Sequence, residues 1–143
     1  MTREEAESVL TEAGLADDGA FPLLEAAIAC AIHDYPFRDP EPVRTLAGNA
    51  AERLNERVGS ESPDDALAET MASDMRLNGD LLNYDHPGNT DVIDVAERRR
   101  GLSATLAIFY IDAARRVGAA ESVIATDVIE SIPAGMAPDR SVE

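Results

Sequence analysis

The chain has 143 residues and a mass of 15.3 kDa, a length that fits one domain and excludes a large multidomain enzyme. Its 28 acidic and 12 basic residues give a net charge of -16, which excludes the broad basic surface that nucleic-acid binding requires. Hydrophobic residues make up 45% but aromatic residues only 4%, so we expect a core of alanine, leucine, isoleucine and valine.

The single cysteine and the lack of any long apolar run exclude further kinds of site and further classes of protein. Cys30 alone excludes an internal disulfide and a cysteine-based zinc site. No run of about 18 apolar residues is present, so we expect no membrane span. The N-terminus is acidic and polar, unlike a signal peptide. We therefore expect a cytoplasmic protein that binds neither nucleic acid nor a membrane.

Two helices are predicted in the first third of the chain. Thr2 and Glu5 form a capping box for a helix over about 3–13, with Gly14 as its stop. The segment 21–32 is apolar nearly all round, which is typical of a central helix. Its spaced apolar residues are Phe21, Leu24, Ile28 and Ile32.

Two further helices are predicted in the middle. Asp39 is expected to cap a helix that ends near Gly59. Ser62 starts another, which we expect the pair Asn78-Gly79 to end. The inward side chains are predicted to be Val43, Leu46, Ala47, Ala50, Leu54 and Val58 in the first helix and Leu67, Met71 and Met75 in the second.

The last third begins with a turn-rich loop over 80–89. A short helix over about 90–99 follows and is closed by Gly101. Ser103 is expected to cap the last clear helix, which ends at Gly118.

The residues after Gly118 give weaker signals of secondary structure. Residues 122–129 fit either a strand or a short helix, and residues 133–143 are interpreted as a tail. The fold class is therefore all-α or mainly α, a compact bundle of about five to six helices with at most a short C-terminal strand. We expect one domain over residues 1–132.

Two residues are candidate nucleophiles. Cys30 lies in mid-helix, where no helix terminus or adjacent histidine in the sequence activates its thiol, so a small buried hydrophobe is the more frequent role. His33 follows three residues later, a spacing that usually reflects surface or packing neighbours. Ser103 lies in the field of a helix N-terminus but needs a base, and both His33 and His86 precede it in the chain. Without a base, we interpret Ser103 as a cap.

The loop before the short helix offers candidate metal ligands, and the end of that helix carries the only basic cluster. The loop does not match an EF-hand, so a structural loop held by Asx turns is the main interpretation. Arg98, Arg99 and Arg100 fit C-terminal capping and pairing with carboxylates, or the anchoring of an acidic partner. The candidate ligands are Asp80, Asp85, His86 and Asp91.

Three motifs occur in a specific order. They are Asn83-Tyr84-Asp85-His86-Pro87-Gly88-Asn89, then Arg98-Arg99-Arg100-Gly101-Leu102, then Arg115-Arg116-Val117-Gly118. Over about residues 20–118 the chain resembles the bacterial invasion-regulator branch of the transglutaminase-like superfamily. In that branch a tyrosine–aspartate–proline–x–asparagine loop precedes an arginine-arginine-glycine turn, a helix ending in arginine–x–glycine, and a sheet.

The resemblance implies a cysteine-protease-like architecture of helices packed on an antiparallel sheet. In catalytically active relatives the residue two after the turn glycine is the cysteine nucleophile, and Ser103 stands at that position here. The family's catalytic histidine lies downstream in a glycine–histidine–phenylalanine motif, and no histidine follows Gly118. The stretch after Gly118 is also short for a multi-stranded sheet, so we expect a mainly helical remnant of the domain.

The sequence therefore predicts a non-catalytic protein-binding or regulatory module that needs no cofactor. A protein partner or a second copy of the chain would cover the face where the sheet is missing. The alternatives are an acyl-transfer or amide-hydrolysing enzyme that uses Ser103 or Cys30 with His33 or His86, and a metal-dependent binding loop. The residues predicted to make the interaction are Phe21, Leu24, Ile28, Ile32, Arg98, Arg99, Arg100, Phe109 and Tyr110.

Overall fold

The computed structural model describes residues 1–17, 21–80 and 82–118, and this part of the chain is mainly α-helical, as the sequence predicts. The predictions for residues 122–129, for the tail from 133 and for a domain limit at 132 lie outside the described residues. The elements in chain order are α1 (Arg3–Leu15), α2 (Leu23–Asp34), α3 (Glu41–Arg57), α4 (Pro63–Ala68), the π-helix η2 (Glu69–Asp74), β1 (Asn78–Gly79), the 3-10 helix η3 (Pro87–Thr90), α5 (Val92–Arg98), β2 (Arg100–Gly101) and α6 (Ser103–Arg116).

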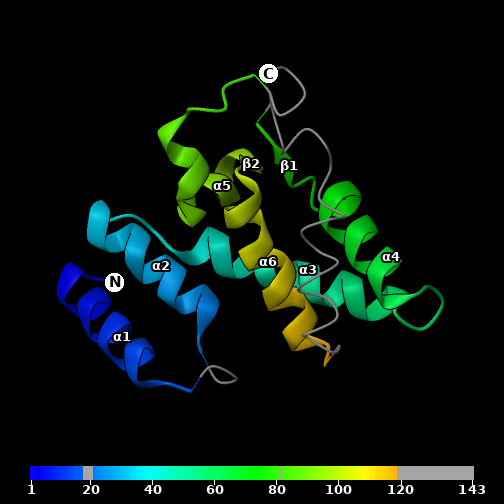
Figure 1. Cartoon of the computed structure of the whole chain (residues 1–143), viewed down its shortest axis with the longest axis horizontal. Coiled ribbons are helices and arrows are strands. Elements are labelled where there is room, and N and C mark those ends of the chain that lie inside the picture. The colour runs from blue at the N-terminus through cyan, green and yellow to red at the C-terminus, as the bar shows by residue number, and fades with distance from the viewer. Residues whose placement is uncertain (18–20, 81, 119–143) are drawn as a thin grey trace.

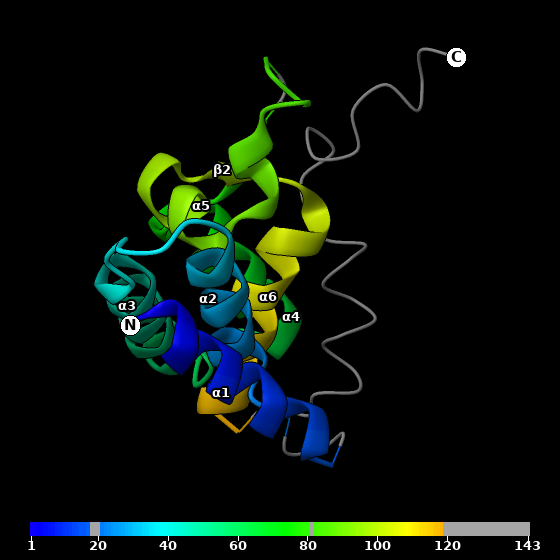
Figure 2. The ribbon, with the colours of Figure 1, turned by 90° about the vertical axis from the view of Figure 1, so that its left-hand side faces the viewer.

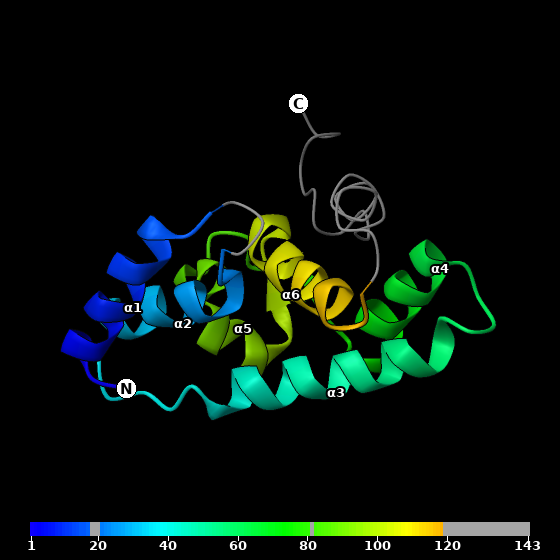
Figure 3. The ribbon, with the colours of Figure 1, turned by 90° about the horizontal axis from the view of Figure 1, so that it is seen from below.

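The core lies where α6 meets its neighbours. In Figure 1, α6 crosses the long helix α3, and α2 and α4 lie on its two sides. Figure 3 shows α3 running along one side of the bundle, with α5 and α6 packed against it. Tyr110 and Phe109 of α6 and Ile28 and Ile32 of α2 are among the largest fully buried side chains. Helix α1 packs on α2 at the edge of the molecule (Figure 2).

The first two helices form as their local signals predict, with differences at their ends. The capping box is present, because Thr2 Oγ1 accepts from Glu5 N at 3.1 Å and Glu5 Oε1 accepts from Thr2 N at 2.8 Å. The predicted stop at Gly14 is wrong, because α1 continues to Leu15, two residues beyond the predicted end at 13, and Ala16 then takes an extended conformation. Helix α2 is also displaced, since it covers Leu23–Asp34 rather than 21–32.

The start of α3 also differs by one residue from its prediction. Pro40 occupies the N-cap position, and the Asp39 carboxylate accepts from Glu41 N at 3.0 Å. Asp39 therefore caps the helix from one residue further out. The predicted inward stripe is confirmed by burial of Val43, Leu46, Ala47, Ala50 and Leu54, with Val58 partly buried.

The pair Asn78-Gly79 does not end a helix, contrary to the sequence prediction. The helical turns end at Asp74, and the left-handed backbone of Arg76 (φ 57°) redirects the chain. Asn78 and Gly79 form β1, which pairs in parallel with β2, Asn78 opposite Arg100 and Gly79 opposite Gly101.

The predicted ends of the two helices that flank β2 need correction. Arg99, with a left-handed φ of 62°, ends α5 in place of Gly101. Leu102 is the N-cap of α6, and Ser103 is the first helical residue rather than the cap. Leu102 takes this position because its N–H donates to Asn89 O at 3.1 Å while its carbonyl accepts from Leu106 N at 2.9 Å.

Candidate functional site

A buried polar network joins the loop after β1 to α5. Asp80 and Asn89 are 5% and 0% exposed, so each must find partners inside the protein. Arg98 supplies them, donating from Nη2 to Asp80 Oδ2 at 2.7 Å and from Nη1 to Asn89 Oδ1 at 3.1 Å. We call Asp80, Asn89 and Arg98 the loop network.

The loop network also fixes the start of α6. The Asn89 side chain donates to the backbone oxygens of Asn83 (3.1 Å) and Tyr84 (2.9 Å), and the backbone oxygen of Asn89 accepts from Leu102 N. These bonds hold the loop closed on itself and against the residue that precedes Ser103. The tyrosine-to-asparagine loop motif and the arginine turn therefore have a shared structural role.

The charge state of Asp80 follows from the same contacts. Burial acts to raise the pKa of this carboxyl, but the hydrogen bonds from Arg98 and from Asn83 N outweigh it and hold the pKa below its usual value. Asp80 is therefore an ionised structural anion.

A second network joins the end of α2 to the start of α5. Asp91 caps α5, because its Oδ1 accepts from Ile93 N at 2.9 Å and from Asp94 N at 3.2 Å. Its Oδ2 accepts from Arg38 Nη2 at 2.5 Å, and the same nitrogen donates to Ala31 O in the last turn of α2 at 2.8 Å. Arg38 thus holds the two helix ends together.

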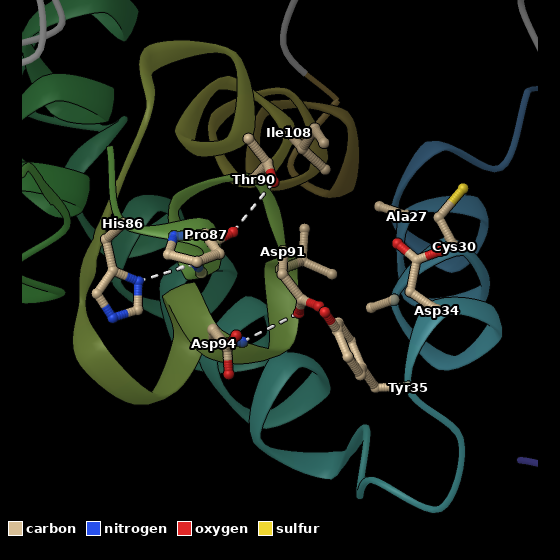
Figure 4. A pocket seen from close by; sticks show the side chains of 13 residues that line it. Ala27, Cys30, Asp34, Tyr35, His86, Pro87, Thr90, Asp91, Asp94 and Ile108 are labelled. Carbon is tan, nitrogen blue, oxygen red and sulfur yellow. Dashed lines mark hydrogen bonds between the residues drawn. The ribbon is translucent and has the colours of Figure 1, made fainter. Parts of the chain in front are cut away.

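A cavity of about 650 Å³ opens between these helix ends (Figure 4). Its lining comes from α2, from the segment around η3, from the start of α5 and from Ile108 of α6. The lining combines small apolar side chains with three carboxylates, a thiol and an imidazole. The lining residues are Ala27, Cys30, Ala31, Asp34, Tyr35, His86, Pro87, Gly88, Thr90, Asp91, Val92, Asp94 and Ile108.

The structure places Cys30 and His86 on this cavity but does not pair them. Cys30 is exposed, which corrects the expectation that it is buried. Figure 4 shows Cys30 on α2 and His86 on the opposite wall, next to Pro87. His86 Nδ1 accepts from Gly88 N at 2.9 Å, so this nitrogen is already engaged.

His33 does not contact Cys30 through any hydrogen bond of the described residues. Its Nε2 lies 3.0 Å from Oε2 of Glu7, and Arg3 Nε donates to the backbone oxygen of His33 at 3.1 Å. Both contacts come from α1, so His33 serves the packing of α1 on α2.

Ser103 lies at the N-terminus of α6, away from the cavity lining. It is partly buried, and neither histidine forms a hydrogen bond with it within the described part of the chain. Neither candidate base is therefore hydrogen-bonded to Ser103.

The predicted metal ligands are either engaged in other contacts or exposed to solvent. Asp80 belongs to the loop network, Asp91 caps α5 and pairs with Arg38, and Asp85 is exposed. Among residues 1–17, 21–80 and 82–118 no group of three or more histidine, cysteine, aspartate or glutamate side chains could hold a metal ion.

Most of the predicted interaction residues are used by the chain's own packing. Leu24, Ile28, Ile32, Phe109 and Tyr110 are at most 5% exposed, so they present almost no surface to a partner. These five side chains build the core, and Phe21 is only partly buried.

The three arginines differ in their surroundings. Arg98 is bound in the loop network. Arg99 donates to the backbone oxygens of Met75 (2.6 Å) and Ala96 (3.0 Å), while Arg100 is exposed. Arg98 and Arg99 therefore have a structural role, and both Arg99 and Arg100 are exposed to solvent.

Sequence reasoning missed the exposed aromatic side chains beside the cavity. Tyr35 and Phe37 are 64% and 93% exposed, and Phe37 has a left-handed φ of 76°. The only signal was the break at Pro36, which indicates a turn but not which side chains it turns outward.

A family profile described as transglutaminase-like superfamily matches residues 41–125. Two curated relatives, both named UPF0162 protein, come from Xylella fastidiosa strains Temecula1 and 9a5c. Each is 30% identical over 106 residues, which cover 71% of this chain and 38% of the relative, so the chain spans well under half of their length. No solved structure matches.

Within the described residues no helix has the length and apolar character to cross a membrane.

Proposed function

The chain belongs to the transglutaminase-like superfamily, and on that premise we propose that it acts as a non-catalytic protein-binding or regulatory module. The observation that carries this proposal is the residue at the start of α6. Ser103 stands where the resemblance places the cysteine nucleophile of active relatives. A serine hydroxyl needs an adjacent base to attack, and the contacts of His33 and His86 lie elsewhere.

We also assign the chain to the invasion-regulator branch of the superfamily. The loop network supports this assignment, because Asn89 comes from the branch's loop motif and Arg98 from its arginine turn. Their direct hydrogen bond gives a physical reason for both motifs to occur together. We place the protein in the cytoplasm, with a protein partner or a second copy of the chain as its ligand.

An acyl-transfer assay tests the lack of catalysis. Incorporation of dansylcadaverine into casein and hydrolysis of a p-nitrophenyl ester should match the buffer rate for the wild type, Ser103→Ala and Cys30→Ala. Ser103→Cys should stay inactive as well, because no histidine is bonded to this position. Turnover that disappears in either alanine variant would contradict the proposal.

The second candidate function is an enzyme that uses Cys30. It is favoured by one observation, the presence of Cys30 and His86 on the same cavity. An enzyme of this kind would hydrolyse a p-nitrophenyl ester at a rate that falls in both Cys30→Ala and His86→Ala. We expect the buffer rate for the wild type and for both variants, and turnover that is lost in either variant would support this second function.

Light scattering and affinity capture test the binding role. We expect either a concentration-dependent dimer or a stoichiometric partner from the native lysate. A strict monomer at high concentration with no partner would contradict it.

A further inference from the structure

The cavity beside α2 carries more negative than positive charge. Asp34, Asp91 and Asp94 all line it. Arg38 offsets part of this charge, since its guanidinium pairs with Asp91 and, at 3.4 Å, with Asp94. Asp34 is exposed and forms no ion pair or side-chain hydrogen bond with the described residues. One carboxylate of the cavity is therefore left to meet a cation from outside.

An apolar surface adjoins the acidic cavity. Tyr35 lines the cavity and is 64% exposed, and Phe37, two residues further on, is 93% exposed. Arg38 holds this turn by donating to Tyr35 O at 3.3 Å and to Ala31 O at 2.8 Å, with its guanidinium 5.3 Å from the centre of the Tyr35 ring. We call Tyr35 and Phe37 the aromatic rim.

The aromatic rim favours a polypeptide ligand over a small molecule. The cavity volume of about 650 Å³ is in the range that takes a long side chain or a small molecule. Phe37 is not part of the cavity lining, so a small amine inside the cavity would leave it in water. A polypeptide can place one residue in the cavity and a neighbouring residue on the rim.

We infer that the cavity and the aromatic rim bind an arginine- or lysine-bearing segment of a protein partner. The basic side chain enters the cavity toward Asp34, and an adjacent apolar side chain packs on Tyr35 and Phe37. The net charge of -16 steers such a segment toward the protein. This inference rests on the proposed binding role and adds the chemistry of the partner.

Fluorescence polarisation with the full chain tests the inference. The probe is a fluorescein-labelled peptide with arginine and leucine residues spaced by glycine and serine, and its counterpart carries glutamate in place of arginine. At physiological salt we expect the arginine peptide to bind at least about tenfold more tightly, the difference that one well-placed charge pair contributes.

Two variants with matched controls locate the site. Asp34→Arg should weaken binding about tenfold, and Phe37→Ser by a similar factor. Asp17→Arg makes the same change in net charge two residues after α1, and Leu15→Ser removes another exposed side chain (83% exposed) at the end of α1. These controls should stay within about twofold of wild type. Asp34→Asn and Phe37→Gly replace any variant whose circular dichroism melt shows that it has not folded.

Three outcomes would overturn the inference. Equal loss in Asp34→Arg and Asp17→Arg would mean that net charge alone attracts the peptide. Equal affinity for both peptides would remove the role of the basic side chain. Full displacement of the peptide by spermidine, with unchanged spermidine binding to Phe37→Ser, would assign the cavity to a small amine.

The same samples separate this inference from the proposed function. A lysine version of the peptide is incubated with the protein and a glutamine-bearing peptide. Mass spectrometry then shows whether the two peptides have become covalently joined. A covalent product would overturn the non-catalytic role and leave the binding result intact. Absence of peptide binding, with no turnover, would overturn only the inference.

Discussion

Asp80 contributes stability through its charge. Replacing it with asparagine keeps the shape but removes the anion that receives Arg98, so Asp80→Asn should cost about 2 kcal/mol of unfolding free energy at pH 7. The folded pKa lies below the unfolded value of 3.8, so the unfolded state takes up this proton first as pH falls. The advantage of wild type over the variant is therefore full above about pH 4 to 5 and shrinks as pH falls through the folded pKa.

Urea unfolding at pH 7 and at pH 3 measures this change. Asp85→Asn is the control, because Asp85 is exposed in the same loop. If Asp80→Asn lowered the free energy of unfolding equally at both pH values, the shape of the side chain and not its charge would explain the loss of stability.

The contribution of Asp112 to stability should change with pH in the direction opposite to that of Asp80. Burial raises the pKa of this carboxyl, and the nearby guanidinium of Arg116, at 2.8 Å, offsets only part of the effect. The unfolded state therefore loses this proton first as pH rises, so wild-type stability falls between pH 3.8 and the folded pKa. Asp112→Asn should gain stability relative to wild type from pH 3 to pH 7 in the same urea measurements, and a relative loss would contradict this.

Phe37 is held in a strained conformation. A non-glycine residue in the left-handed region costs about 1–2 kcal/mol, and this side chain, 93% exposed, recovers little by packing. Phe37→Gly should raise unfolding free energy by about 0.5 kcal/mol once the greater freedom of unfolded glycine is counted. Phe37→Ala keeps the strain and should give no gain, so equal effects in the two variants would argue against strain.

At the scale of elements, Gly101 shows why two short strands can pair beside α5. A Cβ at this position would lie 2.7 Å from Val95 Cγ2 and 3.3 Å from Asn89 O. Valine is stiff and the other atom is backbone, so neither can move away easily. Gly101→Ala should cost about 2 kcal/mol.

Gly48 in α3 is the matched control for Gly101. A Cβ there meets nothing within 4 Å, so Gly48→Ala should raise stability by about 0.5–1 kcal/mol. Thermal melts of both variants measure these changes. A Gly101→Ala variant as stable as the wild type would contradict the close packing at Gly101.

The sequence predicts the helices well because their signals are local. Capping by Thr2 and the buried positions Leu67, Met71 and Met75 follow from spacing within one segment. The exposure of Cys30 does not follow, because α2 is apolar nearly all round and only the placement of α1, α5 and α6 decides which side faces solvent. The pairing of Asn78 with Arg100 joins two-residue strands, which are too short to produce a periodic pattern.

The candidate site depends on distant segments even more strongly. The cavity is formed by residues from α2 and from the start of α5, which are far apart in sequence. Sequence motifs single out Cys30, His86 and Asp91 one at a time. Only the fold brings them onto one cavity and leaves His33 with α1.

At the scale of the whole molecule, the charge of -16 opposes the compact state. The described arginines form several close pairs, such as Arg57 with Asp74 and Arg44 with Glu25, but carboxylates outnumber them throughout. Salt screens the long-range repulsion among exposed carboxylates more than it weakens these short contacts. Raising NaCl from 10 mM to about 0.5 M should therefore raise the melting temperature by about 3–6 °C, equivalent to about 1–2 kcal/mol for a domain of this size. Tetramethylammonium chloride at equal ionic strength should give a similar rise if screening is the cause. A fall in melting temperature with both salts would show that the ion pairs, rather than the repulsion, dominate the electrostatic free energy of folding.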